Sequence, residues 1–167
     1  MMKSTMESVS VNNDVADQAV EGLRNILQQR LVAVVLFGSR ARGDAIPGSD
    51  WDLLVIARDL PEKPFDRLLA LKFGLPLPCR GAVSILARTP EEFERTLPSL
   101  YLDIALDARI LCDPSGYASQ RIDRIRNLIS ESGLARRRTP AGDVWQWTDG
   151  GSAKWPLEWA PMADGAR

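Results

Sequence analysis

Histidine is absent from this chain of 167 residues, and cysteine occurs only at Cys79 and Cys112. Without histidine, the protein cannot use a histidine-based metal site, a histidine-containing catalytic triad or an imidazole proton shuttle. Two cysteines are too few for a disulfide-stabilised scaffold. The sequence therefore excludes the disulfide-rich and the histidine-dependent classes of protein.

The chain also lacks an excess of charge and any long apolar run. Lys and Arg together number 21 against 22 for Asp and Glu, a formal net charge of -1. No general positive field attracts nucleic acid, so a polynucleotide substrate is not expected. The longest apolar run, residues 31–37, is far shorter than the roughly 20 residues of a membrane helix. With no secretory signal pattern at the start, we expect a cytoplasmic protein of about one domain, without a membrane partner.

Two short motifs stand at the edges of two apolar runs. Gly38-Ser39 follows the run of residues 32–37, and Asp50-Trp51-Asp52 opens the run of residues 50–57. Side chains alternate along a strand, so Asp50 and Asp52 should point to the same side. Carboxylates beside substrate phosphates are the ligands that Mg²⁺ prefers. A glycine lets backbone approach a phosphate and a serine can donate to it, so the sequence predicts a metal-bound nucleoside triphosphate site.

The two motifs and their spacing resemble the signature of the nucleotidyltransferase superfamily related to DNA polymerase beta. Residues 40–44 and Ser49 resemble its small prokaryotic branch, the minimal nucleotidyltransferases, some of which act as antitoxins beside a HEPN-domain partner. The resemblance is strong over residues 32–57, weaker through residues 89–93 and 100–103, and faint beyond Gly133. Each motif alone is weak, but their conjunction at the edges of strand-like runs is specific.

The resemblance implies an activity and a set of site residues. Asp50 and Asp52 would hold one or two Mg²⁺ ions on the triphosphate, while Gly38 and Ser39 would grip the outer phosphates. A nucleoside monophosphate, AMP from ATP, would pass to a hydroxyl of a protein or small molecule, and pyrophosphate would leave.

Two arginines beside the glycine-serine motif are further candidates for phosphate binding. Arg40 and Arg42 could each add a contact, because guanidinium groups suit phosphate oxygens. Alternatively, they are solvated helix arginines or partners of Asp44.

The sequence departs from the family at the third carboxylate, which active members carry on a neighbouring strand. The corresponding run, residues 82–86, has Ser84 as its only polar side chain. A serine hydroxyl is a weak base and a poor Mg²⁺ ligand. Glu91, Asp103 or Asp107 could substitute in space, although nothing in the sequence places them there.

Two alternative functions stay open because of this departure. One is a catalytically weak nucleotide-binding module that acts as an antitoxin-like partner of a HEPN-domain protein. The other is a small-molecule transferase of the aminoglycoside-modifying type, against which the missing substrate domain counts.

Apolar periodicity predicts an α/β protein with the nucleotidyltransferase fold, in which helices flank a short mixed sheet. Strands are expected at residues 32–37, 50–57 and 82–87, and residues 74–80 should be a loop. Helices are expected at residues 14–30, 40–44, 65–73, 99–111 and 117–132, and after Thr89, where Pro90 and Glu92 complete a capping box. The predicted division is a flexible arm at 1–11, the nucleotidyltransferase domain at 12–133 and an extension at 134–167.

The extension differs in composition from the rest of the chain. It carries four tryptophans: Trp145, Trp147, Trp155 and Trp159. Because large rings need a place to be buried, the extension is expected to pack on its own domain. The alternative is a segment that docks on a partner. Residues 136–138, three consecutive arginines, should be solvated, with contact to a phosphate or an acidic partner as the alternative.

Overall fold

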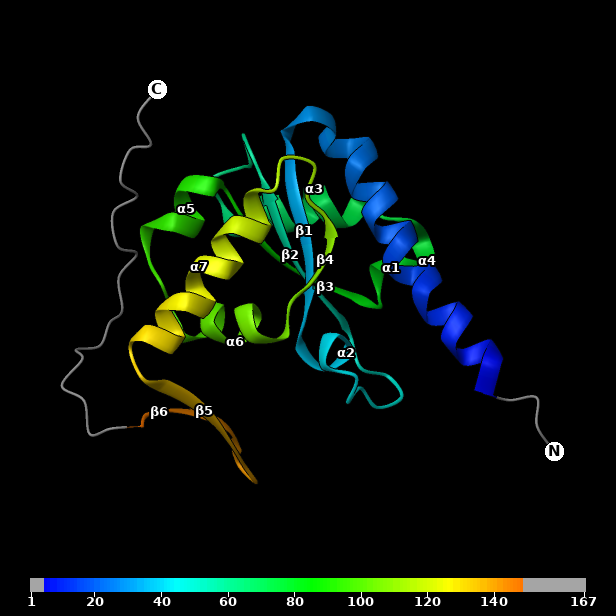
Figure 1. Cartoon of the computed structure of the whole chain (residues 1–167). Coiled ribbons are helices and arrows are strands. Elements are labelled where there is room, and N and C mark those ends of the chain that lie inside the picture. The colour runs from blue at the N-terminus through cyan, green and yellow to red at the C-terminus, as the bar shows by residue number, and fades with distance from the viewer. Residues whose placement is uncertain (1–4, 149–167) are drawn as a thin grey trace.

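A computed structural model describes the backbone of residues 5–148 and the side chains of residues 15–148. A four-stranded mixed sheet in the order β3-β2-β1-β4 forms its centre (Figure 1). Its strands are β1 (Leu31–Phe37), β2 (Trp51–Ala57), β3 (Val83–Arg88) and β4 (Arg109–Cys112). β1 runs antiparallel to β2 and β4, whereas β2 and β3 are parallel. The structure confirms the α/β prediction with a short mixed sheet.

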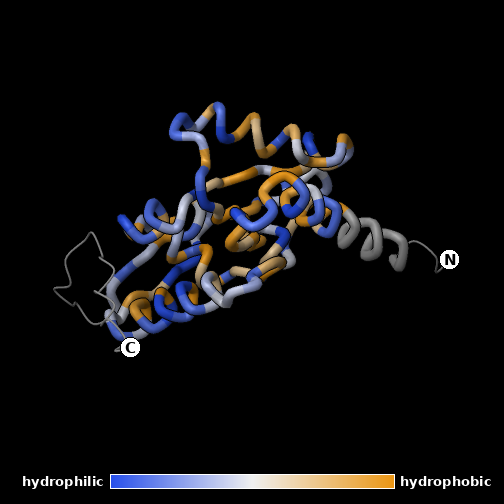
Figure 2. Tube along the Cα trace, turned by 90° about the horizontal axis from the view of Figure 1, so that it is seen from above, coloured by the Kyte–Doolittle hydropathy of each residue, from blue (hydrophilic) through white to orange (hydrophobic). Residues whose placement is uncertain are grey.

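Helices cover both faces of the sheet. The first face packs against α1 (Thr5–Leu27), α3 (Pro64–Gly74) and α4 (Leu77–Arg80). The second face packs against α5 (Pro90–Arg95), α6 (Ser99–Asp107) and α7 (Tyr117–Glu131). A 3₁₀ turn, η1 (Gln28–Arg30), links α1 to β1, and α2 (Gly38–Arg42) links β1 towards β2. Seen from above, hydrophobic residues run along the central part of the molecule, between more hydrophilic outer turns (Figure 2).

Burial in β1 and β2 explains their continuous apolar sequences. Leu53 and Val55 of β2 join the core under α1, whereas Leu54 and Ile56 join the core under α5 to α7. A strand buried on both faces needs apolar residues at every position. Because side chains alternate, Asp52 shares the second face with Leu54.

Several local predictions are confirmed. Thr89 accepts a hydrogen bond from the backbone N–H of Glu92, whose carboxylate accepts one from the N–H of Thr89, so the capping box is present. The helix after Gly38 forms, although it begins at the glycine itself rather than at Arg40.

Three segments differ from prediction by more than a residue or two. α1 begins at Thr5 and takes in most of the residues predicted as a flexible arm, because extending a helix is easier than starting one. The predicted loop at residues 74–80 contains α4, whose prolines lie at positions where a helix tolerates them. The helix predicted to reach Leu111 ends at Asp107, because residues 109–112 pair with the free edge of β1 as β4.

α3 forms where the apolar spacing predicted a helix, but it turns the predicted apolar face outwards. Its buried residues are Arg67 and Leu71, while Phe65 and Phe73 are exposed. Arg67 is accommodated in the interior by bonds to the Glu92 carboxylate at 2.7 and 3.0 Å.

The chain after Gly133 forms a hairpin of β5 (Leu134–Thr139) and β6 (Gly142–Trp147), below α6 and α7 in Figure 1. Trp145 and Trp147 pack against the second core cluster. The indole N–H of Trp145 donates to Asp103 at 3.0 Å. Trp155 and Trp159 lie outside the described residues. Within the described part of the chain, no helix is both long and apolar enough to cross a membrane.

Candidate active site

Gly38 brings the end of β1 against the carboxylate of β2. Its φ is +72°, a conformation that favours glycine. A Cβ at this position would lie 3.2 Å from Cγ of Asp52 and closer still to a carboxylate oxygen. A side chain at position 38 would therefore displace the Asp52 carboxylate, which glycine leaves in place. The backbone that should receive a phosphate lies directly beside the predicted metal ligand.

The predicted metal ligands lie at the start of β2, with Asp52 inside the strand and Asp50 just before its first residue rather than in it. Asp50 is exposed, whereas Asp52 is half-buried at the start of β2. Burial raises the pKa of Asp52, and the Asp50 carboxylate raises it further, while Arg42 acts in the opposite direction. Both effects oppose negative charge on Asp52, and a bound cation would offset them. The donor chemistry therefore fits Mg²⁺, which accepts one or two carboxylates together with phosphate oxygens.

Ser84 is the residue in register with Asp52 on the neighbouring parallel strand. Val83 packs into the first core cluster and Leu86 contacts the second, so alternation places Ser84 on the same face as Asp52. Ser84 is exposed, so a larger side chain would have room there. Among the described residues, no group of three or more Asp, Glu, Cys or His side chains is placed to hold a metal ion.

Arg40 makes structural contacts beside the predicted site. Its Nε donates to the backbone carbonyl of Ser49 at 2.9 Å, and its guanidinium lies 4.6 Å from the ring centroid of Trp51. Both contacts tie α2 to the segment that enters β2. Arg40 thus helps to hold in place the backbone that carries Asp50 and Asp52. The sequence did not predict this structural role.

Arg42 forms two ion pairs in this state of the protein. It contacts Asp44 at 3.1 Å and Asp107 of α6 at 3.3 Å. The contact with Asp44 agrees with the alternative considered for this residue. The contact with Asp107 joins α2 to α6.

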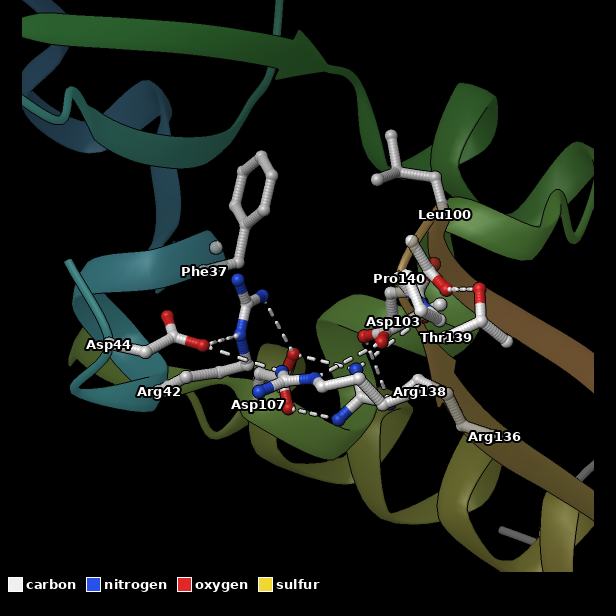
Figure 3. A pocket seen from close by; sticks show the side chains of 13 residues that line it. Phe37, Arg42, Asp44, Leu100, Asp103, Asp107, Arg136, Arg138, Thr139 and Pro140 are labelled. Carbon is white, nitrogen blue, oxygen red and sulfur yellow. Dashed lines mark hydrogen bonds and ion pairs between the residues drawn. The ribbon is translucent and has the colours of Figure 1, made fainter. Parts of the chain in front are cut away.

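A cavity of about 530 Å³ opens beside Gly38 (Figure 3). Its walls come from the end of β1, from α2, from α6 and from the β5–β6 hairpin. Phe37 and Leu100 supply apolar lining, and Arg138 from the hairpin reaches Asp44 at 3.3 Å. This volume falls within the range of small-molecule sites.

The hairpin is attached to α6 by a dense charged contact. Both terminal nitrogens of Arg136 donate to the Asp107 carboxylate, at 2.7 and 2.6 Å. Burial acts to raise the pKa of Asp107, but the bonds from Arg136 and Arg42 hold it below its ordinary value. Asp103 accepts a hydrogen bond from Arg136 at 3.5 Å and another from the indole N–H of Trp145. Arg136 is therefore not solvated as predicted, because it contacts acidic residues of its own chain.

Asp103 and Asp107 were considered as substitutes for the third carboxylate. Both line the cavity beside Gly38, so they lie near the motif. Their oxygens are engaged by Arg136 and Trp145, which makes them structural in this arrangement. Sequence reasoning could not foresee their partners, because these lie in a segment with no recognisable strand pattern.

Solved structures of similar fold include a protein from Sulfolobus solfataricus assigned as a nucleotidyltransferase, at 22% identity and a TM-score of 0.47, which covers 68% of this chain and 94% of that one. Another is a chain in the structure of the tri-AMPylated Shewanella oneidensis HEPN toxin in complex with MNT antitoxin. It has 18% identity and a TM-score of 0.46 and covers 71% of this chain and 90% of that one. These distant likenesses carry no weight in the family assignment.

Two sequence relationships are closer. A Methanocaldococcus jannaschii protein assigned as a protein adenylyltransferase is 31% identical over 121 residues, which make up 70% of this chain and 82% of that protein. The profile of the family described as "Nucleotidyltransferase domain" matches residues 20–112, which include both motifs and all four strands of the central sheet. The chain belongs to the nucleotidyltransferase domain family.

Proposed function

We propose that the protein transfers AMP from ATP, in the presence of Mg²⁺, to a hydroxyl group of a protein or small molecule. The close approach of Gly38 to Asp52 carries the proposal. The backbone of Gly38, which a phosphate can approach, thereby lies beside the carboxylate of Asp52. The surroundings of that carboxylate disfavour its negative charge, as its raised pKa indicates. The relationship to an assigned protein adenylyltransferase favours a protein as the acceptor.

The reaction joins an acceptor oxygen to the α-phosphorus and breaks the bond to the departing pyrophosphate. Gly38 and Ser39 would bind the outer phosphates and orient the triphosphate for attack on its α-phosphorus. Asp50 and Asp52 would hold Mg²⁺, which offsets charge on the phosphate oxygens when it is bound. The cavity beside Gly38 would leave room for the acceptor or the nucleoside.

Calorimetry of ATP binding tests the metal and nucleotide assignments. Mg²⁺ should strengthen ATP binding to the parent protein, because the ion joins the triphosphate to Asp50 and Asp52. The Asp50→Asn, Asp52→Asn double variant should lose this dependence and keep its circular dichroism spectrum. Equal ATP affinity with and without Mg²⁺ in the parent would refute the proposed site.

Incubation with labelled ATP tests transfer itself. Label should pass to a protein acceptor, and pyrophosphate should appear only when Mg²⁺ is present. The assay should be run with and without the product of the neighbouring gene, because the resemblance to minimal nucleotidyltransferases implies such a partner.

A second candidate function is a nucleotide-binding module that acts as an antitoxin-like partner of a HEPN-domain protein. The position of Ser84 favours it, since a serine in register with Asp52 cannot take the proton of an acceptor hydroxyl at neutral pH. Binding of ATP and of the partner without pyrophosphate release would support this alternative over catalysis.

A further inference from the structure

Exposed apolar side chains are concentrated on one short part of the surface. Of the ten large apolar residues that are exposed in the described part of the chain, five lie between residues 65 and 77. We call these five the α3 stripe: Phe65, Leu68, Leu69 and Phe73 of α3, and Leu77 at the start of α4. None of them lines the cavity beside Gly38.

The helical positions of these residues explain why they face solvent together. Phe65, Leu69 and Phe73 recur at four-residue steps, which keeps them on one side of α3. The buried Arg67 and Leu71 occupy the opposite side. An ordinary surface helix buries its apolar side and exposes its polar side. α3 instead buries Arg67 and Leu71 and leaves four large apolar side chains exposed, so these are available to another molecule.

We propose that the α3 stripe is a self-association surface, on which α3 of a second copy packs in an antiparallel arrangement about a two-fold axis. Such an interface is self-complementary, because the same surface is used by both copies. With Leu69 near the axis, Phe65 of each copy would face Phe73 of the other.

The exposed area is sufficient for such a pair. Phe65 is 68% exposed, Phe73 is 66% exposed and Leu77 is 76% exposed. An aromatic side chain buries on the order of 150–250 Å² when it is covered. Two facing stripes would therefore remove on the order of 1,000 Å² from water, which is the lower limit for a biological interface and typical of a weak dimer. A single unpaired stripe would be at the upper end of what monomers expose.

The charges beside the α3 stripe favour a second copy as the occupant. Asp66 lies in the first turn of α3, and the Arg80 guanidinium lies 5.4 Å from the ring centroid of Phe73, near the other end. Asp66 and Phe73 occupy neighbouring angular positions on the helix. An antiparallel pair would therefore bring Asp66 of one copy towards Arg80 of the other, so the charges attract in both halves of the interface.

Sedimentation equilibrium of the full chain over a range of concentrations tests the proposal. The parent should form dimers. Phe65→Glu and Phe73→Lys should each weaken dimerisation by about 100-fold or more, because a dimer of either variant would bury two unpaired charges, one from each copy. Val144→Glu is the matched control, since Val144 is also half-exposed but lies on β6. It should leave dimerisation unchanged. All variants should keep the parent's circular dichroism spectrum and ATP affinity.

Mixing two monomeric variants tests the antiparallel register. A mixture of Phe65→Glu and Phe73→Lys should form heterodimers, because one contact pairs opposite charges and the other is the parental pair of phenylalanines. A mixture of Phe65→Glu and Phe65→Lys should stay monomeric, because each charge would face a phenylalanine. A monomeric parent at about 200 µM, or dimers that Phe65→Glu does not weaken, would overturn the proposal. The proposal would also be overturned if Phe65→Glu lost binding to a different protein and left self-association unchanged.

Discussion

Gly38 and Asp52 lie so close together that a Cβ at position 38 would displace the Asp52 carboxylate. Gly38→Ala should therefore disturb both the turn into α2 and the position of the Asp52 carboxylate. We expect a loss of about 1–3 kcal/mol in the free energy of unfolding, from positive φ and crowding together. ATP binding should weaken more than adenosine binding, because the added methyl group lies where phosphate should approach. Calorimetry with both ligands measures the difference.

Gly43 offers a matched control for this substitution. Its φ is +84°, but nothing lies within 4 Å of the position that a Cβ would take. Gly43→Ala should therefore show the conformational cost without the selective loss of ATP affinity. Ser39→Ala, which removes a donor, should share that selective loss. If Gly38→Ala and Ser39→Ala lost equal affinity for ATP and for adenosine, the motif would be only a structural turn.

The pair of Arg67 and Glu92 should make stability depend on acid pH. Hydrogen bonds from Arg67, opposed in part by burial, lower the pKa of Glu92 to about 2. Because the folded-state pKa lies below the unfolded value near 4.5, the contribution is complete above pH 4.5. It should be lost as the pH falls from 4.5 towards 2.

Chemical denaturation at a series of pH values measures this effect. Glu92→Gln should unfold more easily than the parent at pH 7, and the difference should shrink as the pH falls through that window. Glu91→Gln, in the same helical turn but outside the Arg67 pair, is the control and should leave the profile unchanged. A constant difference between Glu92→Gln and the parent from pH 7 to pH 2.5 would contradict the role of the ion pair.

Arg136 should hold the β5–β6 hairpin against α6. The side chain of Asp107 is only 7% exposed, so its carboxylate depends on Arg136 and Arg42 for compensation. Arg136→Gln should lower the free energy of unfolding by about 3 kcal/mol, the usual scale for removing one partner of a buried pair. Arg137→Gln, an exposed neighbour on the same strand, should change it by less than about 0.5 kcal/mol. Thermal melting of both variants tests this, and similar values for the two would exclude the proposed attachment.

The parts of the protein that could be predicted are those whose physical cause is local. The place of Asp52 on the same face as Leu54 follows from strand alternation, and the capping box at Thr89 follows from hydrogen bonds within one turn. β4 could not be predicted, because four residues after an apolar helix continue its pattern and become a strand only by pairing with β1. Periodicity shows which residues of α3 share a face, but not whether that face points inwards.

The surroundings of the site depend on contacts between distant residues. Arg42 meets Asp107 across 65 positions of sequence, and Arg136 meets the same carboxylate from a hairpin that lacks a strand pattern. Arg40 was predicted to bind phosphate, yet one of its contacts is a backbone carbonyl. Its role as a phosphate ligand stays a prediction.

Ser84→Asp tests whether the missing third carboxylate limits the reaction. Ser84 is in register with Asp52 and exposed, so an aspartate there could join the pair as a metal ligand and accept the acceptor proton. Pyrophosphate release should rise by about 10² or more, because loss of such a base typically costs about 10² to 10⁴ in rate. Ser84→Asn, which adds similar volume without charge, should leave the rate unchanged.

The same variant should also depend more strongly on Mg²⁺ for its stability. The pKa of Asp52 is already raised by burial and by Asp50, so a third carboxylate adds repulsion to an unfavourable pair. Ser84→Asp should melt below the parent in chelator and regain stability when Mg²⁺ is supplied, because the ion binds the folded state. Ser84→Asn should show neither change. A parent that already turns over rapidly, with a Ser84→Asp variant that is slower and indifferent to Mg²⁺, would place the missing acid at another position.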